Sequence, residues 1–477
     1  MGGELAEKVK RGLDSGKSIE EVKSELVSQG FLEENILQEL HEASGEQRTS
    51  EEKRHARVFT FKEVFDRVGY GFSSIQFVNI LFYIIGANFF LVGVVNGLKT
   101  IISLIFSSFF QEYAKVKRVS IGFLSKSGIL FGFSFIVIAM AITVRSVPLF
   151  AAALLVGAVG VVTYGDLYER LAQDYLKREK LGKFLLNISH FGVIITGLAM
   201  VLSGVLFDRF PMLSAHKILL FGKTLPIYGY LICFEVTAIA FILSGYVLHF
   251  VNEKKDDQPK PRGFFRDYWL RLKEQNRQFY RNRYLVLLLL AGSVTGLVQI
   301  LGNSYYGIYI YQKFEQGTFY GIFDGIFLNL SFIFLFAIVF SFLGPAFSNF
   351  LNRRVGLAPS LVFGSLLLAI MPLVAAFNPG FLPLLIANSM SVVGSAILGM
   401  GQGLLVRKLI RDEHRHLYYA AMGVGVILPF IFLIPAGAWV AQTFGLVTLF
   451  QILAGILVCV VAPVYFILVL MANKQRL

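Results

Sequence analysis

The amino-acid sequence predicts an all-α integral membrane protein, with twelve transmembrane helices in two six-helix bundles and a small soluble helical module at the N-terminus. The composition supports this class, because 55% of the 477 residues are hydrophobic and only 16% are charged. Soluble domains have about 25% charged residues. Several uncharged runs also reach the ~20 residues with which a helix crosses the hydrocarbon of a bilayer.

The order of the apolar stretches predicts the two bundles. Residues 65–250 contain the first six, with spans expected near 70–87, 90–110, 119–143, 148–165, 184–206 and 226–250. Residues 284–477 contain the other six, with spans expected near 284–311, 319–343, 357–377, 381–405, 417–439 and 445–471. The basic segment 251–283 is a linker, in which Phe265, Trp269 and Leu272 share one face of an expected interfacial helix.

The placement of the basic residues predicts the orientation. Loops on one side of the expected membrane hold 26 Lys and Arg residues, and loops on the other side hold five. By the positive-inside rule, both termini and the linker are cytoplasmic in a multi-pass protein of the plasma membrane. The formal charge of +13 is therefore a topology signal with some attraction to anionic membrane lipid. This placement argues against a nucleic-acid partner.

The N-terminal segment is polar. Residues 1–45 predict three short helices, and Ser18 followed by Glu21 forms a capping box for the second. With the Gly30-Phe31 turn before the last helix, this run resembles the small three-helix folds of the ubiquitin-associated type. We expect a protein partner, or the protein's own cytoplasmic face, to bind it; the alternative is an appendage without a partner. Residues 46–64 are expected to be a flexible tether and juxtamembrane lead-in.

Two loops add a resemblance to a known family. The loops after the second and eighth spans, SSFFQEYAKVKR (Ser107 to Arg118) and GPAFSNFLNRR (Gly344 to Arg354), both end in basic residues. Together with the six-plus-six layout, they make residues 65–475 similar to the major facilitator superfamily. The resemblance implies a secondary active transporter that works by alternating access, with a small-molecule substrate bound between the bundles.

The family's glycine–acidic–basic loop motif is incomplete. Gln111 and Ser348 occupy the acidic position, although Glu112 is adjacent to the first. In the family this motif acts as a charge latch, so we expect Asp166 or Glu169, at the cytoplasmic end of span 4, to pair with Lys115 as a substitute.

Polar residues recur at helical spacing in spans that the resemblance places around a central cavity. Because polar side chains are costly in lipid, such stripes face a substrate, water or each other. The candidate substrate-binding residues of spans 1, 7 and 10 are Gln76, Asn79, Tyr83, Gln299, Asn303, Tyr306, Asn388, Ser391 and Ser395. Helix–helix packing is the alternative explanation for each stripe.

Four charged residues in the expected spans need a reason, since a charge at the bilayer centre costs about 3 kcal/mol: Lys99, Lys126, Glu235 and Asp324. Lys99, on the face of Asn96, is a candidate for binding an anionic group or for a contact between the bundles. Glu235 is a candidate proton carrier or a hydrogen-bonded acid of a supporting helix. Asp324, at the outer end of span 8, is a further candidate. Coupling and gating are thus assigned to Glu235, Asp324, Asp166, Lys115 and Glu112.

The predicted function is therefore transport, marginally favoured as export of a lipophilic or amphipathic small molecule. Uptake of a sugar-like or small organic solute, as a symporter or uniporter, is the alternative. An alternative from another functional class is a membrane sensor that does not transport, or an enzyme that acts on lipid-linked substrates. No enzyme activity, cofactor or metal is expected, and coupling to protons or sodium is left open. The absence of a phosphate-binding glycine-rich loop argues against direct ATP drive.

Overall fold

The computed structural model covers the whole chain and describes the following residues: 5, 8–9, 11–12, 15, 19–29, 33–116, 120–176, 178–211, 216–220, 223–251, 266, 269–270, 273, 283–409 and 427–474. Most of the predicted linker helix lies outside them.

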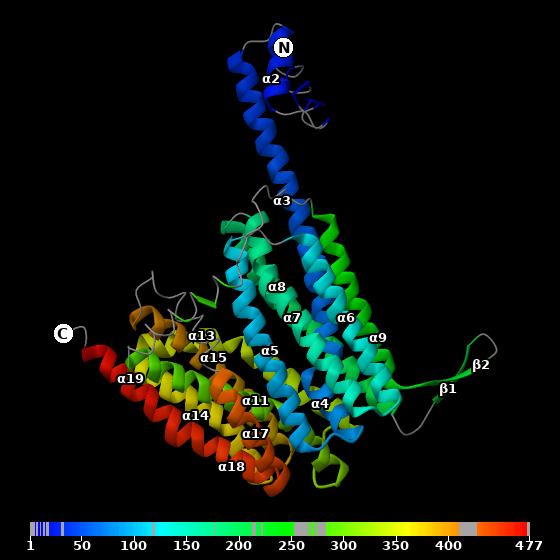
Figure 1. Cartoon of the computed structure of the whole chain (residues 1–477), viewed down its shortest axis with the longest axis vertical. Helices are drawn as coiled ribbons and strands as arrows, with labels where there is room; N and C mark the ends of the chain where they lie inside the picture. The colour runs from blue at the N-terminus through cyan, green and yellow to red at the C-terminus, as the bar shows by residue number, and fades with distance from the viewer. Residues whose placement is uncertain are drawn as a thin grey trace.

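The N-terminal module has a small hydrophobic cluster of its own. Leu5 and Val9 pack with Val22 and Leu26 of α2 (Ile19–Ser28) and with Ile36 at the start of α3 (Glu33–Phe72). Figure 1 shows this module at the far end of α3, away from the rest of the protein. Its predicted protein partner stays a prediction.

Helix α3 runs for 40 residues through the segment where the sequence predicts a flexible tether. The structure therefore has a helix where the first part of residues 46–64 is predicted to be a flexible tether. Residues 33–72 contain no proline, and the polar part is rich in Glu, Lys, Arg and Gln, which all have high helix propensity. Solvated helices and flexible loops are both polar, so composition alone could not distinguish between them here.

The N-terminal bundle contains the end of α3 and six further helices. The first predicted span is divided at Ser73 and Ser74, where α3 ends and α4 begins. The further helices are α4 (Ile75–Ile84), α5 (Phe89–Val116), α6 (Ile121–Thr143), α7 (Val147–Tyr175), α8 (Arg178–Arg209) and α9 (Gly229–Val247), which continues into the short helix η1 (Leu248–Phe250).

The C-terminal bundle contains the remaining helices. They are α11 (Arg283–Glu315), α12 (Ile326–Ser341), α13 (Leu343–Arg354), α14 (Leu357–Ala376), α15 (Phe381–Leu409), α17 (Ile427–Phe444), α18 (Leu446–Ile456), the π-helical segment η3 (Leu457–Val461) and α19 (Ala462–Lys474). The pair α12 and α13 is bent by 43°. The segment α18–η3–α19 forms one span, Leu446–Met471.

Nine helices in the described part of the chain are long and apolar enough to cross a membrane, and the bent pair makes a tenth. The two other predicted spans correspond to the broken α3–α4 segment and to the shorter apolar helix Pro429–Phe444 within α17. The predicted fold class is confirmed. One element was not expected: strands β1 (His216–Leu220) and β2 (Lys223–Ile227) pair antiparallel as a hairpin between α8 and α9.

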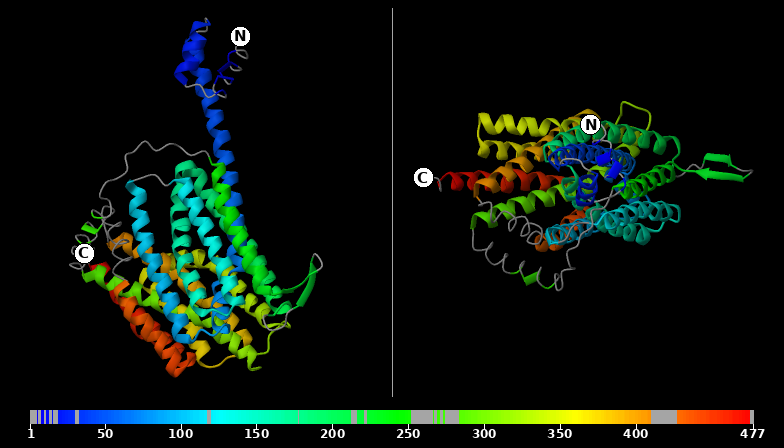
Figure 2. Two further views of the ribbon diagram at one scale, coloured as in Figure 1. Left: turned by 45° about the vertical axis from the view of Figure 1, so that its right-hand side comes forward. Right: turned by 90° about the horizontal axis from the view of Figure 1, so that it is seen from above.

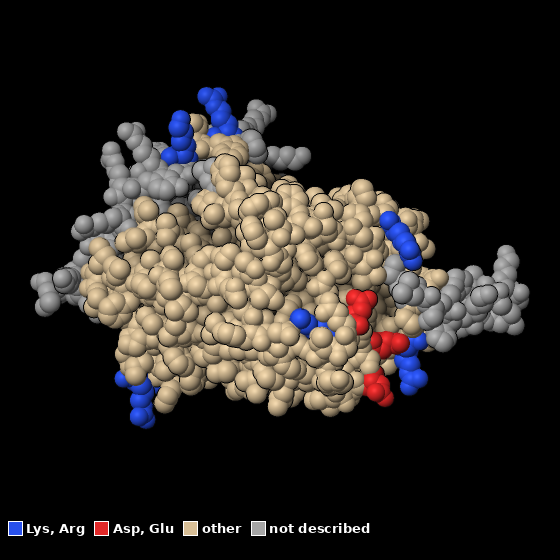
Figure 3. All heavy atoms as spheres, turned by 90° about the horizontal axis from the view of Figure 1, so that it is seen from below, with Lys and Arg blue, Asp and Glu red and all other residues tan. Residues whose placement is uncertain are grey.

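The two bundles meet at one end. We call the end that carries the β1–β2 hairpin the hairpin end, and the end where α3 leaves the bundle the α3 end. Between the bundles, α4 packs on α11, α5 on α11 and α17, and α8 on α12. Figures 1 and 2 show the bundles diverging toward the α3 end. Viewed from the hairpin end, the exposed face has few charged side chains (Figure 3).

Candidate functional site

A chain of three asparagines joins the bundles near their contact. Asn96 Nδ2 on α5 donates to Asn79 Oδ1 on α4 at 3.0 Å, and Asn79 Nδ2 donates to the backbone carbonyl of Asn303 on α11 at 3.2 Å. Asn79 is completely buried, and Asn96 is 7% exposed. Because buried amides need hydrogen-bond partners, these two hydrogen bonds stabilise the arrangement in which α4, α5 and α11 lie together.

The rest of the predicted stripe on α4 faces the same helix. Gln76 Oε1 accepts the backbone N–H of Gly307 at 3.1 Å, and Tyr83 Oη accepts Gln312 Nε2 at 2.7 Å. A Cβ at Gly307 would lie 2.7 Å from Gln76 Oε1, so glycine allows this approach. The polar stripe of span 1 is thus a contact between the bundles toward the hairpin end.

Small residues let the helices approach closely at this contact. Tyr305 Oη donates to the backbone carbonyl of Phe89 at 2.8 Å, and Gly93 leaves room for the Tyr305 hydroxyl. On the other flank, Gly204 of α8 faces Ser331 of α12 in the same way. Small residues at such positions are typical of helix–helix contacts in membranes.

Three of the predicted substrate residues lie inside the C-terminal bundle. The Tyr306 ring packs on Phe450 at 5.1 Å between centroids. Asn388 Nδ2 donates to the carbonyl of Ile333 at 3.3 Å, and Ser391 Oγ donates to the carbonyl of Leu368 at 3.1 Å. All three are buried, so the structure places them in the helix–helix packing that was the alternative explanation.

Other predicted residues are only partly covered. Gln299 Nε2 on α11 donates to Ser395 Oγ on α15 at 2.7 Å, and both residues are half-buried. One turn further along α11, the side chain of Asn303 is exposed although its backbone carbonyl is used in the asparagine chain. Gln299 and Asn303 therefore give this stretch of α11 a polar surface that neighbouring helices do not fully cover.

Lys99 lies on α5 one turn beyond Asn96 toward the α3 end and is half-buried. No carboxylate of the described residues forms an ion pair with it. It is a cation within a predicted membrane span, next to the place where the bundles join.

Two of the four acids predicted to serve coupling and gating, Glu235 and Asp324, lie away from this place. Glu235 is exposed on α9, which packs on α3, α6 and α8 of its own bundle. Its position thus faces outward from the bundle and not toward the other bundle. Asp324 is exposed in the turn before α12, because that helix begins at Ile326 and not at residue 319. The side chains of Glu112, Lys115 and Asp166 lie outside the described residues, so the substitute latch stays a prediction.

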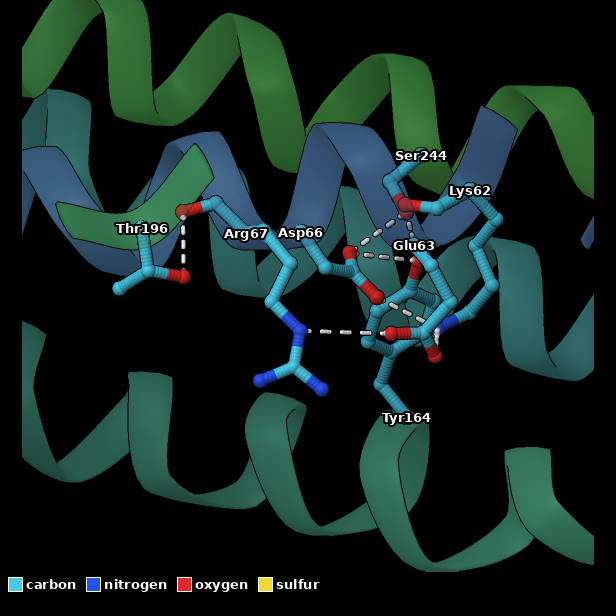
Figure 4. Close-up of polar contacts among 7 residues, drawn as sticks. All are labelled: Lys62, Glu63, Asp66, Arg67, Tyr164, Thr196 and Ser244. Atoms are coloured by element: carbon cyan, nitrogen blue, oxygen red, sulfur yellow. Dashed lines mark hydrogen bonds and ion pairs between the residues drawn. The ribbon is translucent and has the colours of Figure 1, made fainter. Parts of the chain in front are cut away.

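The structure also buries a charged cluster that the sequence did not reveal, formed by Lys62, Asp66, Tyr164 and Ser244 (Figure 4). Asp66 Oδ2 accepts Lys62 Nζ at 2.5 Å, and Asp66 Oδ1 accepts Ser244 Oγ at 2.6 Å and Tyr164 Oη at 3.1 Å. Lys62 is 2% exposed, and its Nζ lies 3.5 Å from the centroid of the Tyr168 ring. The Lys62–Asp66 cluster ties α3 to α7 and α9 inside one bundle.

This cluster was missed because Lys62 and Asp66 precede the first apolar run. The sequence therefore assigned them to a juxtamembrane lead-in, where charges are solvated. The spacing of four residues did contain a signal, since Lys62 and Asp66 share one helical face with Val58 and Phe59 nearby.

Comparison with known proteins supports the fold. No family model matches the sequence, and no curated protein matches it. The nucleoside transporter NupG is similar in structure, with a TM-score of 0.66 at 12% identity over 87% of this chain and 98% of that one. A bacterial homologue of the iron transporter ferroportin in its inward-facing state gives 0.64 at 15% identity over 88% and 98%. A POT family transporter in complex with 5-aminolevulinic acid gives 0.63 at 12% identity over 88% and 96%.

These neighbours are multi-pass membrane transporters and not enzymes. At such identities they show the fold alone, so the chain shares the fold of these proteins, and its long apolar helices make it a multi-pass membrane protein.

Proposed function

We propose that this protein is a secondary active transporter of the major facilitator type that works by alternating access, and that the structure is its cytoplasm-open state. One observation carries the proposal: among the described residues, the hydrogen bonds between the bundles all lie in their hairpin-end halves, while polar side chains toward the α3 end are left partly uncovered. In the proposed orientation the α3 end is cytoplasmic, as the distribution of basic residues indicates.

The cargo site is proposed to lie where the bundles diverge, between Lys99 of one bundle and Gln299, Asn303 and Ser395 of the other. A single cation and neutral hydrogen-bonding groups fit a small organic molecule with one acidic group. Among the described residues no carboxylate pairs with this half-buried cation, and a charge at membrane depth is unfavourable, so an anionic group of the cargo would stabilise it. The 47 Phe residues favour an otherwise apolar, amphipathic cargo and export as the direction.

Binding can be tested on the purified protein with a thermal-shift panel of small organic acids and their neutral amides. The proposal expects acids to stabilise the wild type, Lys99→Met to remove that stabilisation, and Lys99→Arg to retain it. Lys126→Met is the matched control, because Lys126 is exposed on α6. Stabilisation by acids that persists in Lys99→Met would overturn the site.

Transport itself is tested with the stabilising acids in proteoliposomes. Flux should occur with the wild type and fall at least tenfold in Lys99→Met, and imposed proton and sodium gradients would identify the coupling ion. Absence of flux for every stabilising compound would contradict the transport function and favour a sensor.

A further inference from the structure

The N-terminus of α12 receives its cap from the other bundle. Asp208, near the end of α8, places Oδ1 3.0 Å from the backbone nitrogen of Phe327 and Oδ2 2.7 Å from that of Leu328. Both nitrogens belong to the first turn of α12, whose N–H groups have no partner within the helix. Asp208 belongs to the N-terminal bundle and α12 to the C-terminal bundle, so these hydrogen bonds cross the interface at the hairpin end.

The local sequence of α12 cannot supply this cap. The residue at the N-cap position is Gly325, which has no side chain to accept a hydrogen bond, and its φ of +127° disfavours any other residue. A Cβ at Gly325 would also overlap Oδ2 of Asp208. The first-turn N–H groups therefore receive no side-chain cap from Gly325. The space in front of them is free for the carboxylate of Asp208 on α8.

The turn before α12 is held in place independently of Asp208. Asn329 Oδ1 accepts the N–H groups of Ile322 at 2.9 Å and Phe323 at 3.2 Å. Its Nδ2 donates to the carbonyls of Phe323 at 2.7 Å and Gly325 at 2.6 Å. Asn329 therefore fixes the N-terminus of α12 within the C-terminal bundle. The capping carboxylate comes from Asp208 of the N-terminal bundle.

We propose that Asp208 is a latch that holds the bundles together at the hairpin end. This inference rests on the proposed alternating access, in which the bundles must part at that end. The carboxylate is stabilised by the N–H groups and the positive end of the α12 dipole only while the bundles are in contact. When the bundles part, the carboxylate loses the hydrogen bonds from the N–H groups and the interaction with the helix dipole. The cap therefore favours the cytoplasm-open state. The latch lies at the end opposite to the one expected at Glu112, Lys115 and Asp166.

The test is a pair of distances between spin labels in the purified protein without cargo. One pair, Val144→Cys with Phe377→Cys, lies on different bundles at the hairpin end, and the second, Phe61→Cys with Val355→Cys, lies at the α3 end. The four side chains are 65%, 78%, 60% and 52% exposed. The exposed Cys459 is replaced by serine, and the buried Cys233 is retained.

Loss of the latch should lengthen the hairpin-end distance and shorten the α3-end distance. Asp208→Ala is expected to raise the population open at the hairpin end about fivefold, the factor that corresponds to the loss of one N-cap interaction. Asp208→Asn keeps one acceptor and should give a smaller shift. Glu315→Ala removes an exposed carboxylate at the hairpin end of α11 and should leave both distance distributions unchanged.

The same distributions in wild type and both Asp208 variants would overturn the latch, as would an equal shift in Glu315→Ala. If Asp208→Ala does not fold, Asp208→Asn and Gly325→Ala test the same contact, and the latch requires both to shift the distances in the same direction. These results do not depend on cargo. A functioning latch in a protein without measurable flux would therefore contradict only the transport function.

Discussion

Asn79 on α4 donates a hydrogen bond to the backbone carbonyl of Asn303 on α11, with 3.2 Å between nitrogen and oxygen. The two residues belong to different bundles and are 224 positions apart in the chain. This contact uses a main-chain acceptor of α11 and leaves the side chain of Asn303 exposed. The same residue thus contributes to closing one side of the interface and to the polar surface proposed for the cargo.

Asn79→Ala should weaken the closed hairpin end. The change removes two hydrogen bonds and leaves Asn96 Nδ2 buried without its partner, which costs about 1–3 kcal/mol. We expect the label pair at residues 144 and 377 to show a larger population of long distances. The control is Ser127→Ala, because the Ser127 hydroxyl bonds only the carbonyl of Phe123 in its own helix. An unchanged distance distribution would show that the asparagine chain does not contribute to closure.

Adding a methyl group at Gly93 or Gly204 should separate the bundles. A Cβ at Gly93 would overlap the Tyr305 hydroxyl, and one at Gly204 would overlap Ser331. We expect faster amide hydrogen exchange at the hairpin ends of α5, α8, α11 and α12 in both alanine variants, measured by mass spectrometry. Gly399→Ala is the control, since a Cβ at Gly399 would meet no other atom within 4 Å. Equal exchange in all three variants would contradict the close approach.

Removing one member of the Lys62–Asp66 pair should destabilise the N-terminal bundle. Lys62→Met leaves the Asp66 carboxylate uncompensated in a buried site, and breaking a buried pair costs about 3–5 kcal/mol. The double change Lys62→Met with Asp66→Asn should recover most of that loss. The melting temperature in detergent measures both effects.

A matched control for this cluster is Glu63→Gln. Glu63 is 3.9 Å from Lys62 Nζ and 3.6 Å from Nε of the partly exposed Arg67, so its neutralisation should lower the melting temperature less than Lys62→Met does. If the double variant instead loses the sum of the melting-temperature decreases of the two single variants, the two charges act independently.

The continuous course of α3 predicts slow exchange between residues 53 and 64. Amides within a helix are hydrogen-bonded, whereas a flexible tether exchanges at the rate of an unfolded chain. Hydrogen-exchange mass spectrometry on the purified protein distinguishes the two. Ala56→Pro should raise exchange locally, because proline removes a helical hydrogen bond. Fast exchange in the wild type would support the tether that the sequence predicts.

Much of the fold could be predicted because membrane spans have local signals. Length, apolar content and the position of breaks are properties of each segment alone, and they located the helices of both bundles. The errors occurred where a helix continues beyond its apolar part. Residues 46–64 are polar and still helical, and the break at Ser73 and Ser74 falls inside an apolar run.

The candidate site could be predicted only in part. Periodicity identified polar faces on α4, α11 and α15, but it did not show what each face meets. Gln76 and Tyr83 face the other bundle, Asn388 and Ser391 face their own, and Gln299, Asn303 and Ser395 keep partly uncovered polar surface. For Glu235, the apolar sequence around it predicted membrane depth but not the direction of the side chain.

The sequence by itself determined the class of the protein, the number and order of its apolar segments and their expected orientation, because these follow from composition along the chain. The tertiary structure alone decided which polar groups are satisfied within a bundle and which are satisfied across the interface. Asp208 and Phe327 are 119 residues apart, and the hydrogen bond between them depends on how one bundle is placed against the other. No local pattern contains that placement, since the same carboxylate at the end of α8 could equally have faced water.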